Sequence, residues 1–389
     1  MKYIIILLFF SINLFSFNSI KDLQNEDGSF GSTEKEILTS VVLLAFLAHG
    51  ETPTSKEYGN LVKNSLVYLD SKVKELCQDD EISFKHAYAL WSLSEAYAMT
   101  GIAVLEESVE NLSKHIFKYC NEEKWVSVEK SDYTHFNHVL SFAFYTARTC
   151  GIKATDGFNL TTMMQSVIQN AQALSNMDRH DIAVLKLIQL RWQIDTKDLY
   201  FAPCLKEEYS DAELFLIADL MSRLDGDSKL RKKAFIEAGN LSSGLKALLI
   251  KKLSTSGVVE LSEAAKDLQR AMQLSLNLEN SNVLFDECKN SPFHMLSKTI
   301  VYYFEGGEEW KNWNTKFSRH LTALQKPDGT WPNDLEVPNF IKLNDKEKKL
   351  FNSAFASLNL TVYYRYLPGF KPPFRPKPVQ IEEGLDLIE

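Results

Sequence analysis

Apolar residues recur along most of the chain with the spacing of helices, and several of these runs end at a glycine. The runs LLAFLAHG, LSEAYAMTG and FAFYTARTCG end at Gly50, Gly101 and Gly151, and VYYFEGG ends at Gly306, close to three further intervals of the same size. Glycine lacks the Cβ that makes the left-handed conformation costly, so it commonly follows the end of a helix. This spacing predicts a supersecondary unit that returns about every 50 residues.

The helical runs are of two kinds. TSVVLLAFLAH and FKHAYALWSLSEAYAM are apolar on nearly all sides, which predicts helices buried all round. The run that follows Gly50 has one polar face, and Thr54 and Glu57 predict a capping box at its start. A layer of buried helices inside a layer of amphipathic helices predicts an all-α fold with a curved double wall. Residues 176–290 keep helical periodicity but lack clear repeat markers, and their role is not assigned.

The two ends of the chain differ from the part between them. Residues 1–19 contain one lysine followed by about fifteen mostly apolar residues, which is typical of a secretory signal, with an uncleaved N-terminal membrane anchor as the alternative. The protein is therefore expected to be exported, to a periplasm or outside the cell. Residues 371–389 are Pro-rich and then acidic, which indicates an extended arm. The repeat domain is predicted to span residues 20–370.

Charge and cysteine content narrow the classes of partner. The net charge is -8, which argues against binding a nucleic-acid backbone, and membrane association is expected only through the N-terminal segment. The cysteines are widely spaced and form no CxxC pair, so neither a zinc cage nor a redox motif is predicted. Buried free thiols are favoured, and one or two disulfides are the alternative in an exported protein. The five are Cys77, Cys120, Cys150, Cys204 and Cys288.

Two short stretches place an Asp-Gly turn between a glutamine and an aromatic residue. QNEDGSF contains Gln24 and Phe30, and QKPDGTW contains Gln325 and Trp331. They resemble the QW repeat of the terpenoid cyclase and protein prenyltransferase superfamily. Segments such as HAYALWSLSEAYAMTG and GGEEWKNWNTKF are also similar to bacterial proteins with prenyltransferase and squalene-oxidase repeats. The resemblance implies an α/α toroid in which glutamine and aromatic side chains stack between neighbouring helix hairpins.

The motifs that carry the known activities of that superfamily are missing from this sequence. The acidic D-x-D-D cluster of the cyclases has no match, since CQDDE at 77–81 and DGDS at 225–228 both differ from it. The zinc-binding Asp, Cys and His set of the prenyltransferases and the Cys-Gly-Glu-Gln run of the thioester domains are absent as well. We therefore expect no cofactor and no metal, and we assign no catalytic residue.

A set of histidines and carboxylates remains as candidate chemistry. Asp132, His135 and His138 in DYTHFNH follow one another at intervals of three, so they can share one face of a helix. This spacing suits a metal or a proton relay. Contact with a ligand is a second interpretation. A structural role, in which Asp132 caps the helix and the imidazoles form hydrogen bonds inside the wall, is favoured over metal binding.

Two further histidines lie near the starts of apolar helical runs. If all inner helices point the same way, His86, His138 and His294 meet at one mouth of the ring. Glu95 lies inside an apolar helix and needs a partner if it is buried. The alternative is that each imidazole is satisfied separately within its own helix contacts. The candidate ligand-binding set is therefore His86, Glu95, Asp132, His135, His138 and His294.

These observations favour an exported binding protein that uses its central cavity or its rim and has no known catalysis. The expected partner is a hydrophobic small molecule or a protein. The rival hypothesis is an enzyme that acts on an isoprenoid or another hydrophobic substrate through the histidine and glutamate set. The third is a scaffold that holds a protein partner with its outer wall and Pro-rich arm.

Overall fold

The computed structural model describes residues 19–121, 133–155, 208–265, 268, 281–364 and 366–370, and most of these residues lie in helices. They contain no strand, and one isolated antiparallel bridge joins Gln24 and Phe30. The prediction of an all-α fold is confirmed. The helices are α2 (Lys35–Ala48), α3 (Gly59–Leu76), α4 (Phe84–Thr100), α5 (Ala103–Asn121), α6 (Tyr133–Thr149), α9 (Asp211–Leu224), α10 (Ser228–Gly239), α11 (Ser243–Ser254), α13 (Ser281–Cys288), α14 (Pro292–Glu305), α15 (Gly307–Leu324) and α16 (Asp345–Thr361), with short 3-10 turns η2 (Lys153–Thr155), η5 (Val362–Tyr364) and η6 (Pro368–Phe370).

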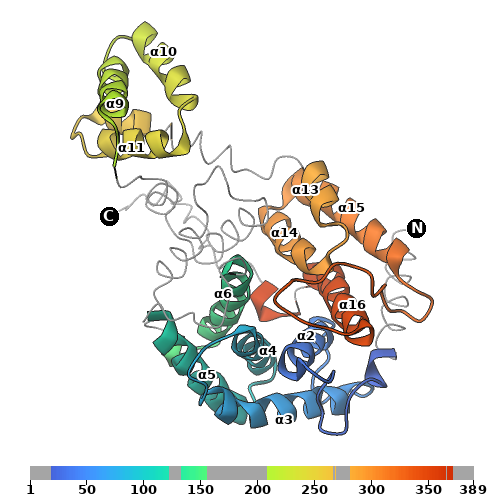
Figure 1. Cartoon of the computed structure of the whole chain (residues 1–389). Coiled ribbons are helices and arrows are strands. Elements are labelled where there is room, and N and C mark those ends of the chain that lie inside the picture. Colours follow the sequence, from blue (N-terminus) through green and yellow to red (C-terminus); the bar gives the residue numbers. More distant parts are fainter. Residues whose placement is uncertain are drawn as a thin grey trace, which may run out of the picture.

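Most of these helices form two layers. Figure 1 shows α6, α4, α2, α16 and α14 side by side in an arc, with α3, α5 and α15 on the outside of the arc. In α2 every residue from Ile37 to Ala48 is buried, as its apolar sequence predicts. In α3 the buried residues recur at helical spacing along one face and the other face is exposed. The difference in sequence pattern therefore corresponds to the difference in layer.

Glycines follow the C-terminal ends of four inner helices. Gly50, Gly101, Gly151 and Gly306 follow α2, α4, α6 and α14, and their φ angles are 85°, 66°, 87° and 72°. A residue with a Cβ is strained in this region of φ, so glycine ends these helices at little conformational cost. The recurring glycines of the sequence thus all lie at ends of inner helices, with positive φ.

The beginning and the end of the described chain lie against each other. Helix α2 packs against α16 as well as against α4. The carboxylate of Glu347 in α16 accepts hydrogen bonds from the backbone N–H and the hydroxyl of Ser32, at 2.7 and 2.8 Å. Burial raises the pKa of Glu347, but the hydrogen bonds from Ser32 and Asn344 outweigh it and leave this pKa lowered. An ionised glutamate therefore joins segments 315 residues apart.

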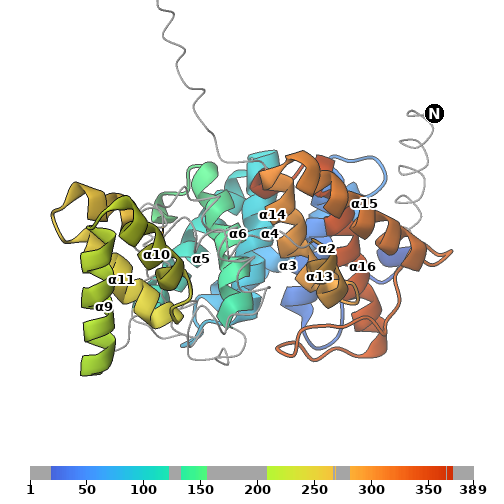
Figure 2. The ribbon, with the colours of Figure 1, turned by 90° about the horizontal axis from the view of Figure 1, so that it is seen from above.

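Helices α9, α10 and α11 form a separate group of three. They pack on one another, and Figures 1 and 2 show them to one side of the arc. Ser210 and Glu213 form a capping box at the start of α9, and the Asp227 carboxylate caps α10. The small side chains of Ala234 and Ala238 are buried in this group. This is the part of the chain in which the sequence shows no repeat markers.

Several predictions fall outside the described residues. These are residues 1–18 of the predicted signal or anchor, the arm at 371–389, and Asp132. Among the helices that the structure describes, none is long and apolar enough to cross a membrane. Three cysteines in the described part of the chain are free thiols, namely Cys77, Cys150 and Cys288.

Candidate functional site

The two Asp-Gly turns have the same internal hydrogen bonds. In the first turn, Gln24 Nε2 donates to the Gly28 carbonyl at 3.0 Å, and Asp27 Oδ1 accepts the Ser29 N–H at 3.0 Å. In the second turn, Gln325 Nε2 donates to the Gly329 carbonyl at 2.8 Å. The glutamine therefore closes each turn by bonding to the backbone ahead of the aromatic residue.

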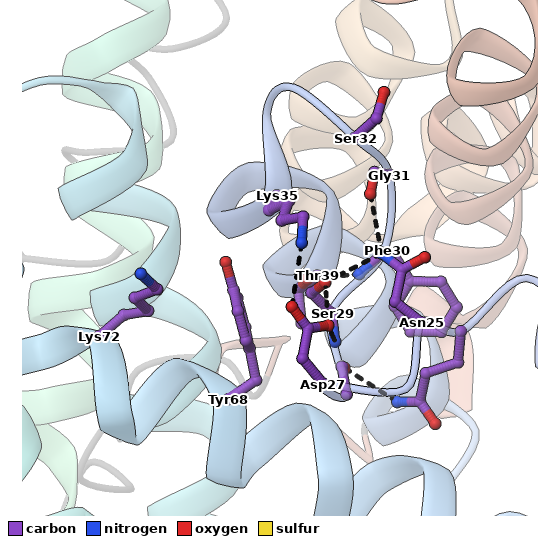
Figure 3. Close-up of polar contacts among 12 residues, drawn as sticks. Asn25, Asp27, Ser29, Phe30, Gly31, Ser32, Lys35, Thr39, Tyr68 and Lys72 are labelled. Carbon is purple, nitrogen blue, oxygen red and sulfur yellow. Dashed lines mark hydrogen bonds and ion pairs between the residues drawn. The ribbon is translucent and has the colours of Figure 1, made fainter.

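A lysine from the following helix holds each turn by an ion pair. Lys35 Nζ lies 2.9 Å from Asp27, and Lys349 Nζ lies 2.8 Å from Asp328. Figure 3 shows the first of these pairs. The pKa of Asp27 falls to about 2 because it accepts hydrogen bonds from Ser29 and Lys35. Burial raises the pKa of Asp328, but hydrogen bonds from Lys349 and Thr330 outweigh it and lower this pKa to about 2. Both carboxylates are therefore ionised under all ordinary conditions.

The aromatic residue of each turn is buried in the wall. Phe30 and Trp331 are both 0% exposed. The Phe30 N–H donates to Thr39 Oγ1 in α2 at 2.9 Å, and the Trp331 N–H donates to Ser353 Oγ in α16 at 3.0 Å. The indole N–H of Trp331 also donates to the Leu321 carbonyl in α15 at 2.7 Å. Each turn thus fastens a surface loop to an inner helix, which is a structural role.

One face of α4 carries four large buried side chains along its length. Phe84, Tyr88, Trp91 and Glu95 lie at intervals of four, three and four residues, so they share this face, and all four are buried. Trp91 stacks on Phe142 of α6 with ring centroids 4.5 Å apart. We refer to these four residues as the α4 stripe.

The C-terminal end of the α4 stripe is covered by η6. Glu95 Oε1 accepts hydrogen bonds from Trp91 Nε1 at 3.1 Å and from Thr146 Oγ1 at 2.9 Å, and Glu95 Oε2 accepts the Gly369 N–H at 3.0 Å. The neighbouring Phe370 is fully buried, with its ring edge-on to Phe142. Glu95 therefore has the partners that a buried carboxylate needs, and it holds η6 against α4 and α6.

The N-terminal end of the α4 stripe is covered by phenylalanines. Phe84 stacks on Phe340, with ring centroids 3.6 Å apart, and lies edge-on to Phe136 of α6. Phe293 of α14 also lies edge-on to Phe340. The starts of α4, α6 and α14 thus meet around a ring from the loop before α16. Sequence reasoning did not identify these residues, although each helix carries its phenylalanine within the first four positions.

Between these two ends lies a buried hydroxyl group without a partner. Tyr88 is 0% exposed, and its Oη makes no hydrogen bond within the described structure. Burial raises the pKa of Tyr88 well above its ordinary value, so the hydroxyl keeps its proton. Leaving such a group unsatisfied costs about 1–3 kcal/mol. Buried serine hydroxyls on the adjacent inner helices are unsatisfied too, and they are Ser40 in α2, Ser94 in α4 and Ser141 in α6.

His86 lies in the contact between α4 and the outer layer. Its Nδ1 accepts the Ser83 N–H at 3.0 Å, so Nε2 carries the proton and donates to the Leu76 carbonyl at 3.1 Å. Its ring stacks on His115 of α5. Burial lowers the pKa of His86 to about 4. Both ring nitrogens are therefore engaged by backbone atoms of α3 and of the start of α4, away from the α4 stripe.

The other predicted site residues are placed differently. His138 is buried, and its ring packs against Phe142 on its own helix. His294 is half-buried and lies edge-on to Phe293. The side chain of His135 is outside the described part of the structure. Among the described residues no group of three or more histidine, cysteine or acidic side chains is arranged to hold a metal ion.

A buried lysine is a functional candidate that sequence reasoning missed. Lys298 in α14 is only 2% exposed, and together with His294 and Ser297 it follows one face of that helix. Burial raises the pKa of the Cys288 thiol to about 11, and the positive charge of Lys298 opposes this shift. A lone basic residue in the apolar run HMLSKTIVYYF was the available signal, since buried lysines are rare unless they have a role or a partner.

The arrangement suits the binding of an apolar molecule better than proton transfer. The α4 stripe consists mainly of buried aromatic rings and holds one hydroxyl without a partner in the described structure, whereas Glu95 and His86 are both engaged in structural hydrogen bonds. Concave apolar sites with few polar groups are the usual form of small-molecule sites. Compared with protein-family models, with curated proteins and with solved structures, the chain gives no match.

Proposed function

We propose that this protein is an exported binding protein that holds an apolar small molecule against the α4 stripe, inside an α/α toroid. The observation that carries the proposal is the Tyr88 hydroxyl, which is fully buried among aromatic rings and has no hydrogen-bond partner in the described structure. A ligand with one polar group would accept this hydrogen bond and remove the desolvation penalty. The proposed ligand is therefore largely apolar, with a single acceptor such as a hydroxyl or carbonyl oxygen.

The toroid part of the proposal is supported by the order in which the inner helices pack. Helix α6 packs on α4, α4 on α2, α2 on α16, and α16 on α14. Because α2 and α16 are far apart in sequence, their contact brings the first and last units together, as in a closed ring of hairpins. The resemblance of the two glutamine-aromatic turns to QW repeats supports the same architecture.

An enzyme acting on a hydrophobic substrate is the second candidate. The observation in its favour is Lys298, a buried amine on an inner helix, because buried lysines often act as bases or nucleophiles. Glu95, the acid that the sequence favoured for this role, has both oxygens occupied by hydrogen bonds. Binding without catalysis is therefore the better supported function.

Native mass spectrometry of the purified full chain tests the proposal. The wild type is expected to carry a small apolar molecule, and Tyr88→Phe is expected to lose it. Removing an unsatisfied buried hydroxyl is neutral or stabilising in the unliganded protein, so the melting temperature of Tyr88→Phe should not fall.

Tyr119→Phe is the matched control. The Tyr119 hydroxyl donates to the Asp79 carbonyl on the outer side of the arc. Its removal should reduce the free energy of unfolding by about 1 kcal/mol and leave the bound molecule in place. A wild type that carries nothing and binds no member of a panel of lipids and terpenoid alcohols contradicts the proposal. So does a Tyr88→Phe variant that is destabilised as much as the control, because the hydroxyl then has a structural partner.

A further inference from the structure

The α9–α11 group exposes far more apolar surface than the rest of the described chain. Of the twelve large apolar side chains that are exposed among the described residues, seven lie between Leu214 and Val259. Phe215 is 77% exposed and Ile236 is 60% exposed. Single exposed apolar residues are common, but a concentration on one small group of helices marks an interaction surface.

The outward face of α10 combines one of these exposed apolar side chains, Ile236, with positive charge. Ala234 and Ala238 point into the three-helix group and are fully buried. On the opposite side of α10 are Lys229, Lys232, Lys233 and Ile236, at the spacing of neighbours on one helix face, and all four are exposed. We refer to these four residues as the α10 face.

Basic residues outnumber acidic residues in this region. Residues 228–252 contain seven lysines and arginines and one acidic residue, Glu237, in a chain whose net charge is -8. Glu237 is paired with Arg223, with Nη2 and Oε2 2.6 Å apart. No salt bridge within the described structure involves a lysine of the α10 face. The face is therefore a local region of positive potential on an acidic protein.

We propose that the α10 face binds the surface of a membrane that contains anionic lipids. Each lysine near such a surface strengthens binding by about 1 kcal/mol, and lysine stems can lie along the apolar boundary while their amines reach the headgroups. Ile236 lies at the centre of the face, where it would enter that boundary, as apolar residues of interfacial helices do. This surface is separate from the α4 stripe, and it goes beyond the expectation that only the N-terminal segment meets a membrane.

The mixed character of the face favours a membrane over a nucleic acid. A nucleic-acid backbone is bound by charge alone or with aromatic stacking, and it leaves an exposed isoleucine in water. A bilayer interface takes up both the charge and the aliphatic side chain.

Vesicle flotation with the full chain tests this proposal. The vesicles are pure phosphatidylcholine and a 7:3 mixture of phosphatidylcholine and phosphatidylglycerol. The test variant is Lys229→Glu, Lys232→Glu and Lys233→Glu together. Three lost lysines should weaken binding to the mixed vesicles about a hundredfold, and binding of the wild type should fall with added salt. The wild type and all variants contain the N-terminal segment, so this segment does not account for a difference in vesicle binding between them.

The control reverses three exposed lysines near and on α3, so that the net charge changes by the same amount. Lys56→Glu, Lys63→Glu and Lys74→Glu together should weaken binding by less than about fivefold, because these residues lie far from the proposed surface. Circular dichroism establishes that both triple variants keep the helical fold. Ile236→Ser, which leaves the charge unchanged, should weaken binding several-fold through the loss of apolar contact.

The proposal is overturned if the α10 triple variant binds mixed vesicles as well as the control does, or if both lose binding equally. It is also overturned if the wild type ignores the vesicles and instead binds a short duplex DNA or RNA through the same lysines. If the triple variant does not fold, Ile236→Ser and the salt dependence of the wild type decide the question. Unchanged vesicle binding by Ile236→Ser contradicts insertion of the apolar side chain, and wild-type binding that does not fall with added salt contradicts charge attraction.

Discussion

The hydrogen bond between Gly369 and Glu95 leads to a sharp prediction about η6. A Cβ added at Gly369 would lie 2.1 Å from Glu95 Oε1 and 2.7 Å from Thr146 Oγ1. Both distances are shorter than any stable contact, and both neighbours are buried. We therefore expect Gly369→Ala to push η6 away from α4 and α6, although alanine is tolerated at most surface loops.

The size of the effect follows from the contacts that would be lost. A hydrogen bond to a charged group contributes about 1.5–3 kcal/mol. Phe370 would also leave its buried position, which contributes about 1.5–3 kcal/mol for a side chain of this size. Part of this loss is recovered because the segment near the end of the described chain gains freedom and water reaches Glu95. We expect a net loss of about 2–4 kcal/mol in the free energy of unfolding.

Urea denaturation followed by tryptophan fluorescence measures this loss. Trp91 donates to the same carboxylate, so its emission should also change in the native state. Gly239→Ala is the matched control, since no atom lies within 4 Å of the Cβ that it adds at the end of α10. That change should be neutral or stabilising by up to about 1 kcal/mol. Equal stabilities of Gly369→Ala and the wild type, with unchanged native tryptophan emission, would refute the reasoning.

Three other outcomes are expected. Trp331→Ala should lower the free energy of unfolding by about 3–5 kcal/mol in urea denaturation, because a fully buried indole and its hydrogen bond to the Leu321 carbonyl are lost. A loss below about 1 kcal/mol would contradict the structural role of Trp331. The pKa of His86 is about 4 in the folded protein, below its unfolded value near 6.5. The stability that the neutral imidazole contributes is therefore present above pH 6.5 and is lost as the pH falls to 4. The expected loss in the free energy of unfolding is roughly 3 kcal/mol. Urea titrations should show a weaker pH dependence for His86→Gln, and an unchanged dependence would contradict this cause. Deleting residues 1–19 should keep the protein in the cytoplasm in cell fractionation, and continued export would contradict the signal prediction.

The helical layers could be predicted from the sequence because each depends on local pattern. A helix that is apolar on all sides, such as α2, has to be buried all round, whichever helices surround it. The one-sided pattern of α3 likewise places it in the outer layer. The Asp-Gly turns could be recognised for the same reason, since glutamine, aspartate and glycine bond within a span of a few residues.

The contacts that close the interior could not be predicted, because their partners are far apart in the chain. Glu95 accepts the N–H of a residue 274 positions later. Phe340 belongs to a loop without helical periodicity, yet it stacks on the first residue of α4. The sequence shows that Glu95 needs a partner, but not which backbone group supplies it.

The histidines show how equivalent sequence positions can differ in function. His86 and His294 are both the third residue of an inner helix, and in both helices a serine three residues earlier accepts the histidine N–H or forms a capping box with it. This Ser-x-x-His pattern is a helix-start signal of the capping-box kind. His138 is the sixth residue of α6, so its side chain points in another direction around its helix. The distance from the helix start and the serine three residues earlier both separate His86 and His294 from His138.

The two segments that cover the ends of the α4 stripe, η6 and the loop with Phe340, link ligand binding to folding in the proposed function. Phe340 and η6 both belong to the last part of the described chain, while the stripe belongs to its first quarter. The interior is therefore complete only when the first and last units have come together through α2 and α16. If the proposed ligand binds against Tyr88, it would stabilise that closed arrangement and not the unfolded chain, so binding would raise the stability of the whole fold. Changes at Gly369, at the far end of the stripe, should for this reason weaken binding as well as stability.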